Sequence, residues 1–147
     1  LVGSEMCIRD RLNSMTKKII RVLGIESSCD ETSVSIVEKS NKKFKVLSNV
    51  VKSQIDIHKF YGGVVPELAA RSHIEKIDLI TKKALDESGI NLNDIDAVAT
   101  TAGPGLIVCL SVGLNFPNHS LPKHNPILGL KSSFIKWNLK NINNKLR

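Results

Sequence analysis

Short apolar runs separated by polar clusters dominate the chain between residues 19 and 53. Residues 19–26 form a β-branched run that ends in a polar cluster, which predicts a buried strand. Residues 32–37 alternate apolar and polar side chains with a period of two, which predicts a second strand. The polar turn SNKK precedes a third predicted strand at residues 45–53. We therefore expect an antiparallel three-stranded meander.

A helical period replaces this pattern after residues 54–63, which are expected to form a loop closed by two glycines. Pro66 suits the first turn of a helix and Gly89 suits its end, so a helix is predicted over residues 66–88. Its apolar side chains recur at helical spacing, namely Leu68, Ala70, Ile74, Ile77, Ile80 and Ala84. Residues 91–96 then form a polar turn.

After this turn the pattern predicts a further strand followed by a further helix. Residues 97–102 predict a fourth strand, parallel to the first because a helix crosses between them. The turn Gly103-Pro104-Gly105 leads into a helix through Gly113 that is apolar all round, so we expect it to be buried within the lobe or against a partner. The order β-β-β-α-β-α resembles the ribonuclease H-like half of the actin/Hsp70-like (ASKHA) fold. We expect this α/β fold, with its second lobe missing.

The chain divides into three zones by pattern and charge. Residues 1–14 lack periodicity and resemble translated adaptor sequence, so we treat them as a non-native head. Residues 15–116 carry the ordered pattern, and residues 117–147 are expected to be an irregular, basic and frameshifted tail. Six of the 21 basic residues and none of the 14 acidic ones lie in this tail, which largely explains the net charge of +7. A solvated tail is a simpler interpretation of this charge than a nucleic-acid patch.

Composition limits the class of protein further. With 147 residues, 41% of them hydrophobic, the chain fits one folded domain. No apolar run approaches the roughly 20 residues that span a bilayer, so we expect no membrane insertion. The three cysteines are odd in number and lack a CxxC pair, which favours a cytoplasmic location.

Three segments are candidates for chemistry. The first is the turn that contains Ser28, Cys29, Asp30 and Glu31, whose amides, hydroxyls and carboxylates suit phosphates and a bridging cation. An ordinary Asp/Ser-rich turn is the alternative interpretation. Cys29 is expected to be a small buried thiol rather than a nucleophile, because no positioned histidine base is evident.

The second segment surrounds the start of the long helix. Its site candidates are Gly62, Gly63, Glu67, Arg71 and His73, where paired glycines permit close approach and the helix start attracts anions. The alternative places Glu67 and Arg71 on the surface as ordinary charges and His73 partly in the core.

The third segment is the glycine turn at the end of the fourth strand. Gly103 and Gly105 lie where open α/β sheets bind ligands, although neither a GxGxxG fingerprint nor a P-loop is present. No histidine or cysteine spacing typical of a metal site occurs. We therefore predict no metal ligands in this chain.

Taken in order, VLGIESSCDETSVSI, YGGVVPELAARSH and DIDAVATTAGPGL resemble the TsaD (Gcp) family over about residues 20–116. The resemblance implies an acyltransferase of tRNA processing, which transfers threonylcarbamoyl from its adenylate to N6 of adenosine 37. It also implies one divalent metal, iron or zinc, a TsaB-like heterodimer partner and a TsaE-like ATPase. Asp30 and Glu31 are the expected catalytic residues, through a cation or by orienting the carbamoyl group. The other candidates above line the site for the adenylate.

The resemblance ends after residues 126–129, which match a family strand. The family's H-x-E-x-H metal motif should follow there, but the chain continues with LKSSFI. We therefore expect a truncated fragment that is inactive alone. The alternative is a non-catalytic lobe that binds a TsaB-like protein.

Overall fold

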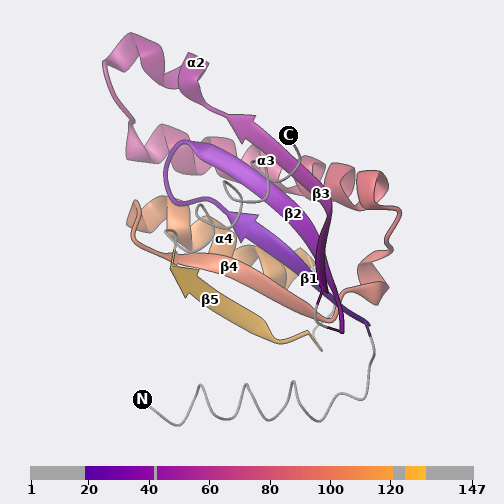
Figure 1. Cartoon of the computed structure of the whole chain (residues 1–147). Helices are drawn as coiled ribbons and strands as arrows, with labels where there is room; N and C mark the ends of the chain where they lie inside the picture. Colours follow the sequence, from indigo (N-terminus) through magenta and orange to yellow (C-terminus); the bar gives the residue numbers. More distant parts are fainter. Residues whose placement is uncertain (1–18, 42, 121–124, 132–147) are drawn as a thin grey trace, which may run out of the picture.

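A mixed five-stranded sheet forms the body of the protein in a computed structural model that describes residues 19–41, 43–120 and 125–131. The strand order across the sheet is β3-β2-β1-β4-β5 (Figure 1). The strands are β1 (Ile19–Glu26), β2 (Glu31–Ser40), β3 (Lys43–Ser53), β4 (Ala97–Gly103) and β5 (Ile127–Lys131).

The predicted meander and the predicted parallel pairing are both confirmed. β1 pairs antiparallel with β2, from Ile19 opposite Ser40 to Glu26 opposite Ser33, and β2 pairs antiparallel with β3. β4 lies parallel to β1 on its other side. This arrangement brings the carboxyl ends of β1 and β4 to the same edge of the sheet.

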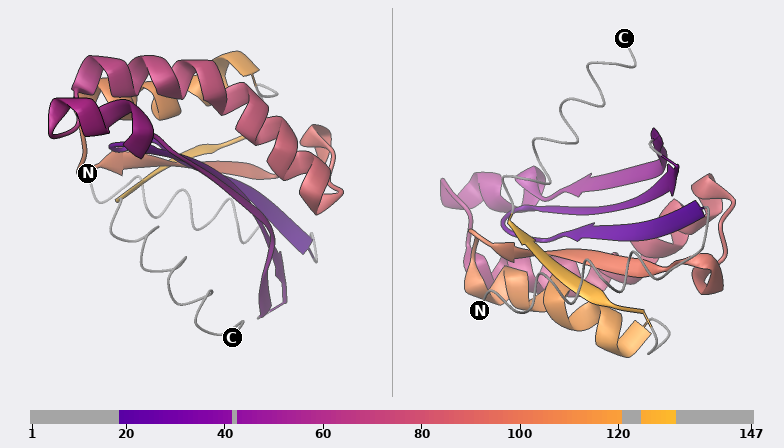
Figure 2. Two further views of the ribbon diagram at one scale, coloured as in Figure 1. Left: turned by 90° about the horizontal axis from the view of Figure 1, so that it is seen from above. Right: turned by 60° about the horizontal axis from the view of Figure 1, so that its bottom comes forward.

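Two long helices cover one face of this sheet (Figure 2). α3 (Pro66–Ser88) packs on β2 and β3, whereas α4 (Ile107–Ser120) packs on β4 and on α3. The bounds of α3 agree with those predicted, and Gly89 ends it in a left-handed conformation with φ 67°. The core between the helices and the sheet includes Leu23, Ile25, Val34, Ile36, Ile77, Ile80, Val98 and Phe116.

The predicted loop at residues 54–63 is wrong in part. It contains α2 (Ile55–His58) and a 3-10 turn, η1 (Lys59–Tyr61). The carbonyl of Gln54 accepts hydrogen bonds from the amides of Ile57 and His58, which starts the helical turn. An element this short shows no helical period in the sequence.

The predictions for α4 and for the chain after it also need correction. α4 continues beyond Gly113 to Ser120, because Phe116 and Pro117 are buried against the rest of the protein. Within this lobe it is not buried on all sides, since Ile107 is 81% exposed, so of the two expectations only burial against a partner stays a prediction for this face. Residues 117–120 are therefore helical within the zone expected to be irregular, whereas β5 overlaps the strand expected at residues 126–129. The predicted head and the rest of that tail lie outside the described residues.

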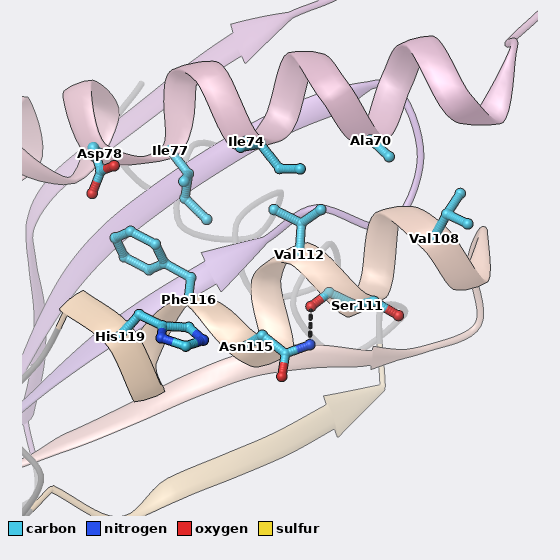
Figure 3. Close-up of a pocket in the computed structure, with 10 residues that line it drawn as sticks. All are labelled: Ala70, Ile74, Ile77, Asp78, Val108, Ser111, Val112, Asn115, Phe116 and His119. Atoms are coloured by element: carbon cyan, nitrogen blue, oxygen red, sulfur yellow. Dashed lines mark hydrogen bonds between the residues drawn. The ribbon is translucent and has the colours of Figure 1, made fainter.

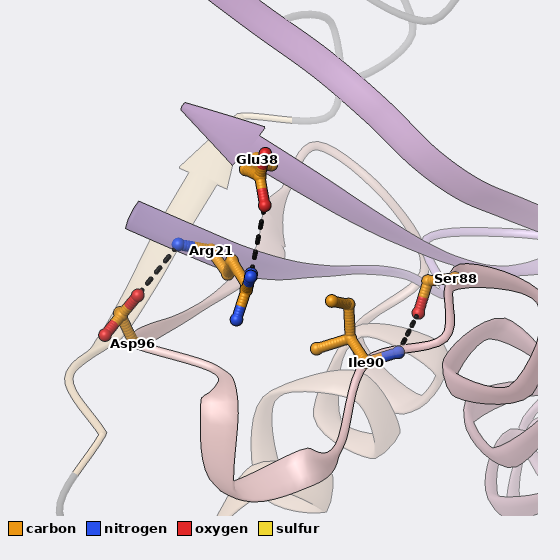
Figure 4. A network of polar contacts seen from close by, with 5 residues as sticks. All are labelled: Arg21, Glu38, Ser88, Ile90 and Asp96. Atoms are coloured by element: carbon orange, nitrogen blue, oxygen red, sulfur yellow. Dashed lines mark hydrogen bonds and ion pairs between the residues drawn. The ribbon is translucent and has the colours of Figure 1, made fainter. Parts of the chain in front are cut away.

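The edge of the sheet opposite the glycine turns is held by polar contacts. The amide of Arg21 donates to the Asp96 carboxylate at 2.9 Å, and its guanidinium Nε contacts Glu38 at 3.1 Å (Figure 4). Nearby, the Ser88 hydroxyl accepts from the amide of Ile90 at 3.2 Å. These contacts hold the connection between α3 and β4 in place. They therefore help to set the register of β4 against β1.

Candidate functional site

The turn between β1 and β2, residues 27–30, is tied to α4. The Ser27 hydroxyl donates to the carbonyl of Cys109 at 2.9 Å and accepts from the amide of Gly113 at 3.2 Å. The carbonyl of Ser28 accepts from the amide of Leu106 at 2.8 Å. The first and third predicted segments are therefore in direct contact.

Gly105 shows how close this contact is. A Cβ at this position would lie 2.5 Å from the carbonyl oxygen of Ser28 and 2.7 Å from its Cβ. Gly103 precedes it with φ 147°. Glycine is thus required at Gly105 by the packing of the turns, which explains the pattern without a ligand.

Glu26 joins the same turn to β4. Its side chain is 7% exposed. One carboxylate oxygen accepts from the amide of Ser28 at 2.7 Å, and the other accepts from the hydroxyl of Thr101 at 2.5 Å. Sequence reasoning missed Glu26 as a site residue. The available signal was a charged residue that ends an otherwise apolar buried strand.

His73 supports the turn from α3. It is 0% exposed. Its Nε2 lies 3.0 Å from the carbonyl of Cys29, which can only accept, so Nε2 carries the proton. Its Nδ1 then accepts from the hydroxyl of Thr32 at 2.7 Å. Burial lowers the pKa of His73 below its ordinary value of 6.5, which keeps the ring neutral.

Gln54 supplies a further support that sequence reasoning missed. Its backbone amide donates to the carbonyl of Asp30 at 2.9 Å. Its side chain is 1% exposed and contacts the ring of His73 at 3.2 Å. No sequence motif marks Gln54, because its role depends on the approach of β3 to the turn.

These contacts bear on the expected role of the turn. The amide of Ser28 and the hydroxyls of Ser27 and Thr32 are engaged within the protein, so these three groups are not open donors for a phosphate. Cys29 and Asp30 are half-buried and Glu31 is exposed, so all three residues reach solvent. The prediction that Cys29 is a buried thiol is therefore wrong, because it lies at the tip of the turn. The carboxylates of Asp30 and Glu31 are acceptors, which suit amine or amide donors or a cation.

The second predicted segment is only partly brought to the turn. His73 contacts it, but from the interior of the fold. Arg71 is exposed. Residues two apart on a helix point about 200° apart, so the side chains of Arg71 and His73 do not reach one anion together. Gly62, Gly63 and Glu67 are also exposed.

Within the described residues, no group of three His, Cys, Asp or Glu side chains is arranged to hold a metal ion. The described residues therefore do not form a complete metal site. No helix in the same part of the chain is long and apolar enough to cross a membrane.

A groove between α3 and α4 is a second surface feature. It has a volume of about 450 Å³, and apolar side chains from both helices point into it (Figure 3). Ile74 is 62% exposed there and Val108 is 45% exposed. A polar contact on its α4 side joins Asn115 to the carbonyl of Ser111 at 2.8 Å.

The topology and the paired turns define one lobe of an actin-like fold. YeaZ from Pseudomonas aeruginosa is a similar solved structure, with a TM-score of 0.50 at 16% identity over 76% of this chain and 43% of that one. At this identity the likeness shows the fold alone. The profile of the TsaD family, tRNA N6-adenosine threonylcarbamoyltransferase, matches residues 45–132. The chain belongs to this family.

Curated relatives carry the same description. The protein of Pelagibacter ubique is 65% identical over 103 residues, which are 69% of this chain and 29% of the relative. The protein of Prochlorococcus marinus is 56% identical over 65% of this chain and 27% of its own length. That of Thermosipho melanesiensis is 51% identical over 74% of this chain and 33% of its own length. The matched region therefore spans about a third of these relatives.

Proposed function

We propose that this chain forms the N-terminal lobe of an enzyme that transfers threonylcarbamoyl from its adenylate to N6 of adenosine 37 in tRNA. Family membership supports the transferase class. The observation that carries the proposal is a turn fixed by β4, α3 and α4 that leaves Asp30 and Glu31 toward solvent. A turn whose backbone is held in this way presents carboxylates to a reacting group with little rearrangement during the reaction.

In this proposal Asp30 and Glu31 orient the carbamoyl group or a cation beside it. Cys29, Gly103 and Gly105 shape the surface against which the adenylate lies. His73 acts indirectly, because its ring holds the turn from inside. The iron or zinc ion, the TsaE-like ATPase and the cytoplasmic location belong to the same proposal for the whole protein.

The test uses a full-length chimera in which residues 19–120 of this chain replace the matching region of the Pelagibacter ubique relative. We expect Asp30→Ala with Glu31→Ala to lower threonylcarbamoyl transfer to tRNA by about 100-fold or more. The matched control is Asp86→Ala with Glu87→Ala, two exposed acidic residues at the far end of α3. Full transfer by the first variant, with the same thermal unfolding midpoint, would refute the catalytic assignment.

The α3–α4 groove supports a second candidate function, a lobe that pairs with a TsaB-like protein. Ile74 and Val108 expose apolar surface of the kind that interfaces bury. We expect Ile74→Arg and Val108→Asp to abolish co-purification with such a partner. Leu79→Arg is the control, because Leu79 is 69% exposed on another side of α3. Unchanged pairing by the groove variants would exclude this surface as the contact.

A further inference from the structure

Two exposed aromatic side chains project from the element that follows β3. Phe60 is 82% exposed and Tyr61 is 63% exposed, both in η1. The ammonium of Lys59 lies 5.2 Å from the centre of the Phe60 ring. Figure 1 shows that α2 and the segment after it extend beyond the end of β3. Because Ser53 at the end of β3 pairs with Glu31 at the start of β2, this segment follows the end of the sheet that carries the β1–β2 turn.

The base of this element is fixed to the candidate site. Gln54, directly before α2, donates its amide to the carbonyl of Asp30. His58 at the end of α2 is 4% exposed and contacts the Gln54 side chain at 3.3 Å. The ring of His58 also accepts from the amide of Val65 at 3.4 Å. The aromatic residues therefore belong to a segment whose start is hydrogen-bonded to the β1–β2 turn.

The chemistry of this surface suits single-stranded RNA. Unpaired bases stack on aromatic rings, and cations beside them contact the phosphates. Lys59 also forms an ion pair with Asp56 at 3.1 Å, but both side chains are more than half exposed. An exposed pair contributes little free energy, so Lys59 can leave Asp56 for a phosphate at small cost. Packing against another protein segment would instead bury both charges.

We propose that Phe60 and Tyr61 stack on bases of the single-stranded RNA loop that carries the acceptor adenosine, with Lys59 beside its backbone. The proposal rests on the proposed function and names the part of the chain that holds the RNA substrate. Stacking at the end of the sheet that carries Asp30 and Glu31 would hold the RNA loop near the site without reading its sequence.

The test measures binding of a fluorescent anticodon stem-loop RNA to the chimera. Phe60→Ala with Tyr61→Ala should weaken binding about 10- to 100-fold, as expected for the loss of one or two stacked bases. Phe60→Leu with Tyr61→Leu should bind as weakly, because leucine keeps apolar area without a ring. Phe60→Trp with Tyr61→Phe should restore binding to within about threefold of the parent.

Phe44→Ala is the matched control. Phe44 is 71% exposed, and Lys39 lies 5.9 Å from its ring, but it occupies the opposite end of β3. We expect its loss to leave RNA binding unchanged. Thermal unfolding midpoints should stay constant in all variants, since each ring is exposed.

Two outcomes would overturn the stacking proposal, namely parent-like binding by the alanine variant or restored binding by the leucine variant. Transfer by the parent chimera is measured separately. If the parent transfers threonylcarbamoyl but loss of the rings does not change RNA binding, the stacking proposal is refuted and the proposed function stands. If RNA binding depends on the rings but no transfer occurs, the proposed function fails and the RNA surface stands.

Discussion

Glu26 allows the strongest quantitative test of how the candidate site is built. Its carboxylate accepts two hydrogen bonds, from the amide of Ser28 and from the hydroxyl of Thr101, and all three residues are at most 7% exposed. A hydrogen bond to a charged acceptor contributes about 1.5 to 3 kcal/mol. Glu26→Ala removes both bonds and leaves two buried donors without their partner.

We expect Glu26→Ala to lower the free energy of unfolding by about 2 to 4 kcal/mol, less than the full sum because water can enter the space left. Glu26→Gln keeps one acceptor oxygen for the Ser28 amide. Its amide nitrogen can donate to the Thr101 hydroxyl, which then turns to accept. The cost should therefore be about 1 kcal/mol.

The assay is urea unfolding of the 147-residue chain followed by circular dichroism. Glu38→Ala is the control, because it removes a partly exposed ion pair with Arg21, worth at most about 1 kcal/mol. A loss in Glu26→Ala no larger than that in Glu38→Ala would refute the conclusion that Glu26 joins β4 to the turn. A double-mutant cycle pairs Glu26→Ala with Thr101→Val. If the two losses in unfolding free energy simply add in the double variant, Glu26 and Thr101 do not interact, which would contradict the contact between the turn and β4.

The remaining predictions concern the other two supports of the turn. Because burial lowers the pKa of His73, protonation favours the unfolded chain, so stability is fully present above pH 6.5 and decreases as pH falls toward the lowered folded pKa. Urea midpoints at several pH values should show this loss, and His73→Gln should flatten the slope below pH 6.5; an equal slope in both proteins would contradict the assignment. Gly105→Ala should cost about 1 to 3 kcal/mol, since its Cβ would meet Ser28. Gly63→Ala, where a Cβ meets nothing within 4 Å, should leave the unfolding midpoint unchanged, and equal effects of the two substitutions would argue against the close contact.

Local pattern was sufficient for most of the framework. The β-branched run of β1 and the period of α3 between Pro66 and Gly89 specify their elements through side chains adjacent in sequence or on one helix face. The helix that intervenes between β1 and β4 also determines that these strands are parallel. By contrast, the turn of α2 was not predictable, because four residues carry too little periodicity.

The candidate site depended on tertiary structure to a greater extent. The sequence placed Asp30 and Glu31 in a polar turn, and the three motifs in order indicated the family that the comparisons then showed. It left open whether Arg71 and His73 face a ligand or face solvent and the core, and the structure agrees with the second alternative. It could not show that Glu26 contacts Thr101, 75 positions away. Such contacts arise only when β4 and α3 pack against β1 and β2, so their partners are set by topology rather than by neighbours in the chain. For the same reason the sequence identified the residues of the turn, and only the fold determined which of their polar groups remain outside.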